Sequence, residues 1–193
     1  MAQEVLYPNG IDSDNANFSV AGAPTKWEAL DDPRNSPNDS DYVSCGTSGQ
    51  EIRFTLTNTS SNISAGAVIN FVRVFIRCGA AGGTLSGQES RGFIRSGGVN
   101  QYGTWVNSAG LQDQENQFPT DGSAPFTKST LDSLVVGIGF QDLVATVDAN
   151  RHTQLHVLVD FVASPVKILA ARRRASARLL LRGSALQPYR GRF

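Results

Sequence analysis

Hydrophobic and polar residues alternate with a period of two through much of the first 163 residues. The pattern is clearest in residues 51–57 (EIRFTLT), 67–78 (AVINFVRVFIRC) and 153–162 (TQLHVLVDFV). Because successive side chains of a β-strand point to opposite faces, this period predicts strands with one face in a core. Phe71 and Phe75 share a side with arginines in the second segment, which predicts that this side is not bare to water.

The alternation in residues 153–162 predicts which side chains of this strand point into the core and which point outward. Its aliphatic and aromatic residues are expected to point into the core, and most of the residues between them are polar and are expected to point outward. The expected inward set is Leu155, Val157, Val159 and Phe161, and the expected outward set is Gln154, His156 and Asp160 beside Leu158.

Shorter segments of the same kind, separated by turns, continue the pattern. The turns are rich in Gly, Pro, Asn, Asp and Ser, and PNGIDSDN at 8–15 is expected to be one of them. Many short strands at such spacing are typical of a sandwich or barrel rather than of alternating strands and helices. Residues 128–134 (KSTLDSL) fit one helical turn. Further strands are expected at residues 3–7, 17–20, 41–45, 91–95, 102–106 and 134–140.

The pattern changes at Ser164-Pro165, which divides a body, residues 1–163, from a C-terminal arm, residues 164–193. Proline disfavours a helical residue before it and cannot donate to a strand ladder. Beyond it, the chain is rich in Ala, Leu and Arg, which favours a helix over about 167–182 with Gly183 as its end. The apolar residues of this segment do not form one stripe, so an extended arm laid along a partner remains an alternative.

The body and the arm also differ in charge. The chain has 17 acidic and 17 basic side chains, a formal net charge of zero, yet every acidic residue lies at or before Asp160. Eight bases fall within 163–193, so nine bases face 17 acids in the body, which carries −8 against +8 in the arm. An acidic globule with a basic arm is typical of a protein that docks onto a partner.

The sequence does not show the features of a signal peptide, a membrane span or a phosphate-binding loop. The start, MAQEVLYPNG, has neither a basic region nor an apolar run, so no signal peptide is expected. No apolar stretch approaches the ~20 residues of a membrane span. Cys45 and Cys78 are expected to be half-buried thiols. The glycine-rich stretches at 79–83 and 137–139 lack the Gly-Lys-Ser/Thr of a phosphate-binding loop.

No group of residues predicts catalysis, a metal site or a cofactor. His152 and His156 have metal-like spacing only on a helix, and on the predicted strand they stand roughly 13 Å apart on one face. Loops around Asp12 and Asp14, and between 31 and 41, offer oxygen ligands for calcium, but without the spacing of a calcium-binding loop. Turn formation explains these Asp and Asn residues more simply. We therefore expect no enzyme.

Two tryptophans are candidates for a sugar-binding platform. Trp27 and Trp105, with Tyr42 and Tyr102, offer flat faces of the kind that grip pyranose rings. Packing in the core or at a sheet edge is the competing interpretation, and the small number of tryptophans favours it.

The arm has three interpretations: it neutralises phosphates of a nucleic acid, lies on an anionic membrane, or docks on acidic protein surfaces, including the body of a neighbouring copy. Its interleaved Leu and Ile favour protein docking, because they require apolar pockets; nucleic acid remains an alternative and a membrane is not expected. The residues expected to dock are Lys167, Arg172, Arg173, Arg174, Arg178, Leu179, Leu180, Leu181, Arg182, Tyr189, Arg190, Arg192 and Phe193.

Seven segments follow one another in a characteristic order along residues 4–163. They are VLYPNG, WEALDD, DSDYVS, FTLTN, GAVINFVRVFIR, the Ser/Thr-Leu-Asp-Ser-Leu-x-x-Gly stretch from Thr130 to Gly137, and TQLHVLVDF. This ordered set resembles the jelly-roll domains of tailed-bacteriophage virion proteins. The resemblance implies an accessory virion part, such as a capsid decoration, neck, collar, tail or fibre component, and no shared catalytic residues. The Arg-rich arm is not a constant part of that pattern, so its role is argued from its chemistry.

Together these observations predict an all-β, jelly-roll-like antiparallel β-sandwich with an Arg-rich C-terminal arm. The expected function is that of a non-enzymatic virion protein, assembled in the host cytoplasm as a homo-oligomer and anchored by its arm. Opposite charges on body and arm allow head-to-tail contacts between copies. The expected partners are other virion proteins and further copies of the chain. The alternatives are a carbohydrate-binding host-recognition module of a tail fibre and a genome-contacting capsid component.

Overall fold

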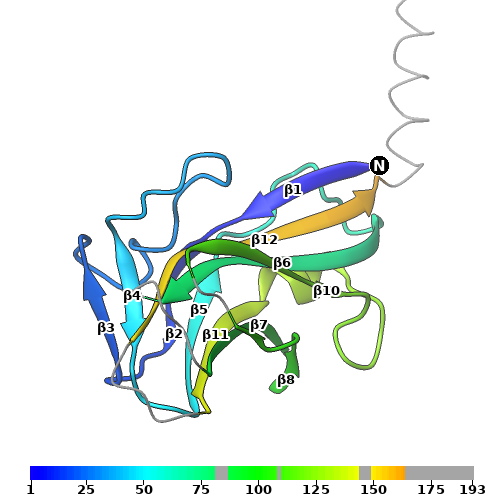
Figure 1. Cartoon of the computed structure of the whole chain (residues 1–193). Coiled ribbons are helices and arrows are strands. Elements are labelled where there is room, and N and C mark those ends of the chain that lie inside the picture. The colour runs from blue at the N-terminus through cyan, green and yellow to red at the C-terminus, as the bar shows by residue number, and fades with distance from the viewer. Residues whose placement is uncertain (81–86, 108–109, 144–148, 164–193) are drawn as a thin grey trace, which may run out of the picture.

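The chain folds into two antiparallel β-sheets packed face to face (Figure 1). This computed structural model describes residues 1–80, 87–107, 110–143 and 149–163. Each sheet has six strands, and the described helix content is one short segment. The predicted fold class, an all-β sandwich of jelly-roll type, is therefore confirmed.

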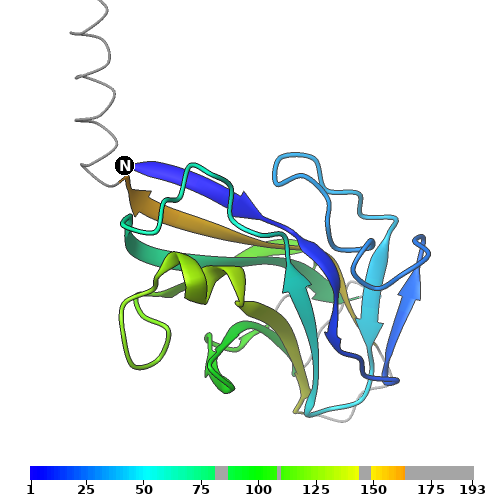
Figure 2. The same cartoon turned by 180° about the vertical axis from the view of Figure 1, so that it is seen from behind.

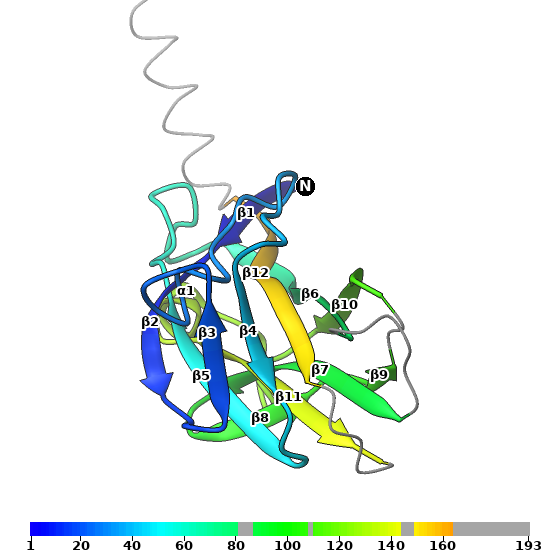
Figure 3. The same ribbon diagram turned by 60° about the vertical axis from the view of Figure 1, so that its left-hand side comes forward.

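Sheet 1 is built around its longest pair of strands, which pair along almost their whole length. In spatial order its strands are β10 (Gln112–Phe118), β6 (Val68–Ala80), β12 (Asn150–Val162), β4 (Tyr42–Cys45) and β3 (Phe18–Ala21), with β1 (Ala2–Leu6) also paired to β12. One edge of β12 thus meets β6, while its other edge meets first β4 and then β1. Figure 3 shows β4 and β12 side by side with the second sheet behind them.

Sheet 2 forms the other layer. Its order is β2 (Pro8–Ser13), β5 (Gln50–Leu56), β11 (Val135–Asp142), β7 (Gln88–Ser96) and β8 (Val99–Tyr102), with β9 (Val106–Asn107) also paired to β7. The helix α1 (Lys128–Asp132) precedes β11 and begins at Thr127, whose side chain accepts from the Thr130 backbone N–H in a capping box. This helix confirms the single turn expected near residues 128–134.

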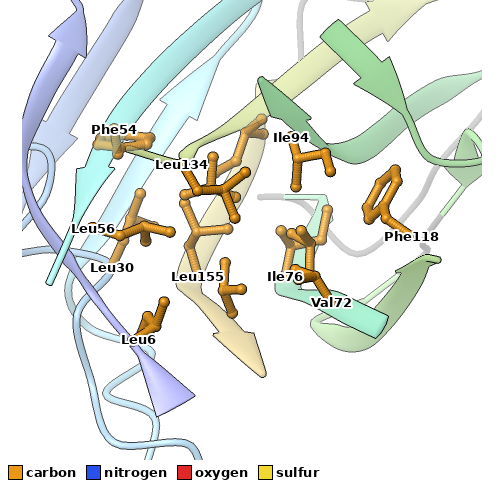
Figure 4. Close-up of a cluster of buried hydrophobic side chains, with 14 of the residues drawn as sticks. Leu6, Leu30, Phe54, Leu56, Val72, Ile76, Ile94, Phe118, Leu134 and Leu155 are labelled. Atoms are coloured by element: carbon orange, nitrogen blue, oxygen red, sulfur yellow. The ribbon is translucent and has the colours of Figure 1, made fainter. Parts of the chain in front are cut away.

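The core fills the space between the sheets (Figure 4). Side chains from alternate positions of both layers meet there, and each one buried contributes about 1.5–3 kcal/mol to folding. Labelled members are Val72, Ile76 and Leu155 from sheet 1, and Phe54, Leu56 and Ile94 from sheet 2. The inward set expected on β12 lies in this core, with all four side chains at most 2% exposed. Cys45 and Cys78 are thiols that form no disulfide with each other and are fully buried rather than half-buried.

The strand predictions fail in three places. Residues 8–15, expected to be a turn, largely form β2, which pairs with β5 through two irregular registers. Residues 102–106, expected to be one strand, fall between β8 and β9. The edge strand β10 (QDQENQF) was not predicted, because hardly any of its inward residues are apolar. The arm, including the helix expected at 167–182, lies outside the described residues.

Both ends of the body meet at one pole. Ala2 of β1 pairs with Phe161 of β12, so the N-terminus and the last body strand lie side by side (Figure 1). The arm therefore starts from this pole. Among the described residues, no helix has the length and apolar character needed to cross a bilayer.

Candidate ligand site on the outer face of sheet 1

The outer face of sheet 1 carries aromatic and charged side chains from β6. Val72, Val74 and Ile76 point into the core, so the residues between them point outward. The outward set is Phe71, Arg73, Phe75 and Arg77, and all four are half-buried. The expectation that this face is not bare to water is confirmed.

Three rings form a row across this face. His156 of β12 lies opposite Phe75 of β6, and their rings stack with centroids 4.8 Å apart and planes inclined by 12°. On the other side of His156 lies Tyr7, which follows β1, with ring centroids 6.3 Å apart. The row spans three strands, and such offset stacking is a favourable arrangement for aromatic rings.

His156 is nearly enclosed, and its polar atoms lack partners. Its side chain is 2% exposed, and neither Nδ1 nor Nε2 makes a hydrogen bond. Burial, together with the nearby charge of Arg34, lowers the pKa of His156 to about 4, and Asp113 opposes the shift. The imidazole is therefore neutral at pH 7, with one donor and one acceptor available.

A long loop, residues 22–41, joins β3 to β4 and runs beside β12 (Figure 2). The Leu155 backbone N–H donates to the Leu30 carbonyl at 2.9 Å, where β12 passes from β4 to β1. The Gln154 side-chain amide donates to the carbonyls of Asp32 and Pro33 at 3.0 and 2.8 Å. The loop thus takes the place of a strand at this point of the sheet.

A cavity of about 270 Å³ lies between this loop and the sheet. Phe75 and His156 contribute its aromatic wall, and Arg34 lies over the Phe75 ring, 4.5 Å from the ring centre. Its polar lining comes from Arg34, Asn35, Asp113 and Gln154. The cavity therefore combines flat apolar surface with groups that donate and accept hydrogen bonds, as small-molecule sites do.

Arg77 connects the loop to the sheet beside this cavity. Its guanidinium donates to both carboxylate oxygens of Asp39 in the loop, at 2.8 Å each, and to Asp113 of β10 at 3.1 Å. These hydrogen bonds hold the pKa of Asp39 below its usual value, with help from the Thr153 hydroxyl, and raise the pKa of Arg77. An arginine that donates two hydrogen bonds to one carboxylate fixes the orientation of that carboxylate and also neutralises its charge.

Replacing Arg77 by Met is expected to lower the free energy of unfolding by about 1–2 kcal/mol, because Asp39 and Asp113 lose their shared cation. The pKa of Asp39 should rise towards its ordinary value. Urea unfolding and an NMR titration of the Asp39 carboxyl measure both effects. Arg73→Met is the matched control: Arg73 pairs with Glu115 within the sheet and does not touch the loop. Equal losses in the two variants would contradict a role for Arg77 in holding the loop.

The two tryptophans do not share a surface. Trp27 is half-buried in the loop and packs against the core. Trp105 lies on the outer face of sheet 2, where the Arg91 guanidinium is 4.1 Å from its ring centre and 3.7 Å from that of Tyr102. Trp27 thus contacts the core and Trp105 contacts an arginine, and the sugar-binding platform stays a prediction. The aromatic groups that do line a cavity, Phe75 and His156, were placed on the outward face by the sequence but not recognised as a site.

The expectation that His152 and His156 share one face of a strand is wrong. The register of β12 against β6 shifts between His152 and Gln154, and this bulge turns His152 into the core. Its Nε2 lies 2.9 Å from the Ser90 hydroxyl and its Nδ1 3.3 Å from the Val43 carbonyl. Ser90 and His152 are 0% exposed, so this pair is a contact of the interior.

The acidic loops are explained by protein contacts. Asp12 pairs with Arg53 at 3.1 Å, and Asp14 pairs with Lys26 at 2.6 Å. Within the described ranges, no group of three or more His, Cys, Asp or Glu is arranged to hold a metal ion. The docking residues expected between Lys167 and Phe193 lie outside the described part of the chain.

No protein-family profile and no curated protein matches the chain. Among solved structures, the CBM22-1 xylan-binding domain of Xyn10C from Paenibacillus barcinonensis is 9% identical with a TM-score of 0.42, over 82% of this chain and 96% of that one. The Stig cyclase Fisc from Fischerella sp. TAU is 10% identical with a TM-score of 0.38, over 82% and 84%. TmCBM61, solved with β-1,4-galactotriose, is 12% identical with a TM-score of 0.29, over 84% and 88%. These solved structures include both carbohydrate-binding domains and a cyclase.

Proposed function

We propose that this chain is a non-enzymatic structural protein of a bacteriophage particle, with its β-sandwich displayed and its basic arm docked on other virion proteins or on further copies of itself. The observation that carries the proposal is the separation of charge, −8 in the body and +8 in the arm. Arginine suits such docking, because its fork binds a carboxylate with two hydrogen bonds.

The surface of the body supports this proposal. In the loop between β3 and β4, Glu28, Asp31 and Asp32 form no ion pair with any described residue. Burial raises the pKa of Asp31, and the neighbouring charges of Asp32 and Glu28 add to the shift. A cation placed near these carboxylates would relieve their repulsion. The body thus offers acidic groups without counter-charges to an arginine-rich segment.

The arm is also long enough to reach a neighbour. It starts where β12 ends, at one pole of the sandwich, and comprises residues 164–193. Thirty residues span up to roughly 100 Å when extended and about 45 Å as a helix. Head-to-tail contacts of this kind build rings or lattices from identical copies.

Deleting residues 164–193 is expected to leave a folded body that no longer assembles. The buried core formed by the described residues lies between Leu6 and Phe161, so the truncation removes none of these side chains. Sedimentation at low salt measures self-association, incorporation into purified particles measures docking, and urea unfolding checks the fold. A full-length variant with Arg172, Arg173, Arg174 and Arg178 replaced by Gln should show the same loss. Normal incorporation of the truncated protein would contradict the anchoring role.

A further inference from the structure

The cavity beside β12 has the features of a binding site. His156 is only 2% exposed, yet both of its ring nitrogens lack hydrogen-bond partners. Buried polar atoms are almost always hydrogen-bonded, because an unsatisfied one costs about 1–3 kcal/mol. The imidazole lines the cavity beside the exposed Arg34, so a molecule that enters the cavity and displaces Arg34 would be placed to supply the missing bonds.

Charge around the cavity selects a neutral molecule. Arg34 and Arg77 bring two positive charges, and Asp39 and Asp113 bring two negative ones. Arg77 is already bound to both carboxylates, and the imidazole is neutral at pH 7. There is no surplus of cations for a phosphate and no group of carboxylates for a metal ion among these residues.

The polar rim fits hydroxyl groups. The Gln154 Nε2 donates to the loop carbonyls, which fixes the amide and leaves its Oε1 able to accept a hydrogen bond from a ligand. Asp113 uses Oδ1 for Arg77 and is 71% exposed, so Oδ2 can accept from a ligand. Asn35 is exposed and offers both a donor and an acceptor. Because a hydroxyl both donates and accepts, a polyol matches this mixed set better than an ion does.

The aromatic wall fits the apolar face of a sugar ring. Phe75 stacks on His156, and the guanidinium of Arg34 lies over the Phe75 ring. Arg34 is exposed and has no carboxylate partner among the described residues, so this contact is the one that a ligand would displace. A volume of about 270 Å³ is slightly below the range typical of small-molecule sites, roughly 300–1,000 Å³, which suits one ring rather than a chain of them.

We infer that this cavity binds a single neutral sugar residue, whose hydroxyl groups bond to His156, Asn35, Asp113 and Gln154 and whose apolar face lies against Phe75. The residues that line the site all belong to the body, so this inference goes beyond the proposed function and stands or falls without it. A structural protein with such a site would attach to a glycan through its displayed body.

The test uses the full-length protein with methyl glycosides of glucose, galactose, mannose and N-acetylglucosamine, and with inorganic phosphate as an anionic probe. NMR follows the imidazole resonances of His156 during each titration. At least one glycoside is expected to give a saturable shift with a Kd on the order of 1 mM, the range of weak single-site binding. Phosphate is expected to give none.

Two variants and one control locate the site. His156→Phe keeps a stacked ring and removes both nitrogens, and Asn35→Ala changes only an exposed loop side chain; each is expected to weaken binding at least tenfold. Binding to these variants is followed through the resonances of Phe75. Trp105→Phe, on the outer face of sheet 2, should leave the Kd unchanged within twofold. The inference is overturned if no glycoside binds, if phosphate alone binds, or if His156→Phe binds as tightly as the native chain.

Discussion

Lowering the pH from 7 to 4 is expected to remove roughly 6 kcal/mol from the free energy of unfolding, because two buried histidines resist protonation. Burial lowers the pKa values of His152 and His156 to about 4 each, against 6.5 when unfolded. As the pH falls, the two histidines therefore bind protons in the unfolded chain at pH values at which they stay neutral in the folded chain. Stability from this source is complete above pH 6.5 and is lost as the pH falls towards 4, at roughly 3 kcal/mol per histidine.

The two sites oppose protonation for different reasons. The Val43 carbonyl can only accept, so Nδ1 of His152 carries the proton and Nε2 accepts from the Ser90 hydroxyl. A second proton would bind to Nε2 of His152, which could then no longer accept the hydrogen bond from Ser90 inside the core. At His156, Arg34 adds repulsion, while Asp113 partly offsets it.

Urea unfolding at several pH values measures this effect, and His156→Phe separates the two contributions. The variant keeps the stacking with Phe75 and should lose only about half as much stability on acidification. At pH 7 its stability should be close to that of the native chain, because two unsatisfied buried nitrogens are removed with the ring. Identical acid profiles for the variant and the native protein would show that His156 is not held neutral by the fold.

The sequence predicts the strands whose two faces differ most. In β5, β6 and β12 every second residue is apolar, so the period alone identifies the face that packs in the core. It does not show that Gln154, His156 and Asp160, on the other face of β12, are buried as well. In β10 the inward residues Gln114 and Asn116 are polar, and nothing in the local pattern distinguishes it from a loop. Its pairing with β6 decides its conformation, and that is information from across the sheet.

The candidate site was harder to predict, because a distant loop completes it. The sequence places His156 and Phe75 on outward faces but does not show that they are neighbours on adjacent strands. It also gives no indication that residues 22–41 fold over this face and bring Arg34 to Phe75. Likewise, the bulge before Gln154 separates the two histidines onto opposite faces, and no residue type at that position signals it.

The Gly-Ile-Gly stretch in β11 has a structural explanation that its composition did not reveal. Ile138 points into the core, so Gly137 and Gly139 face outward in the middle of sheet 2. A Cβ on Gly137 would lie 2.1 Å from the ring of Phe93, a side chain that is 0% exposed. Because Gly137 has no side chain, the Phe93 ring can occupy the space beside its backbone.

Replacing Gly137 by Val is therefore expected to lower the free energy of unfolding by about 3 kcal/mol or more. β11 is held between β5 and β7, so neither its backbone nor the enclosed ring can shift easily. The higher strand propensity of valine, worth about 1 kcal/mol at most, does not offset this clash. Gly46→Ala is the matched control: its Cβ would have its nearest neighbour at 3.9 Å, and stability should stay the same or rise slightly.

A second substitution tests the cause directly. If the ring of Phe93 makes Gly137 necessary, the double variant Gly137→Val with Phe93→Ala should lose less stability than the sum of the two single losses. Removing the ring opens the space that valine needs, so a favourable coupling of more than about 1 kcal/mol is expected from urea unfolding. Additive losses would mean that the strand itself, rather than the ring packed on it, excludes a side chain at this position.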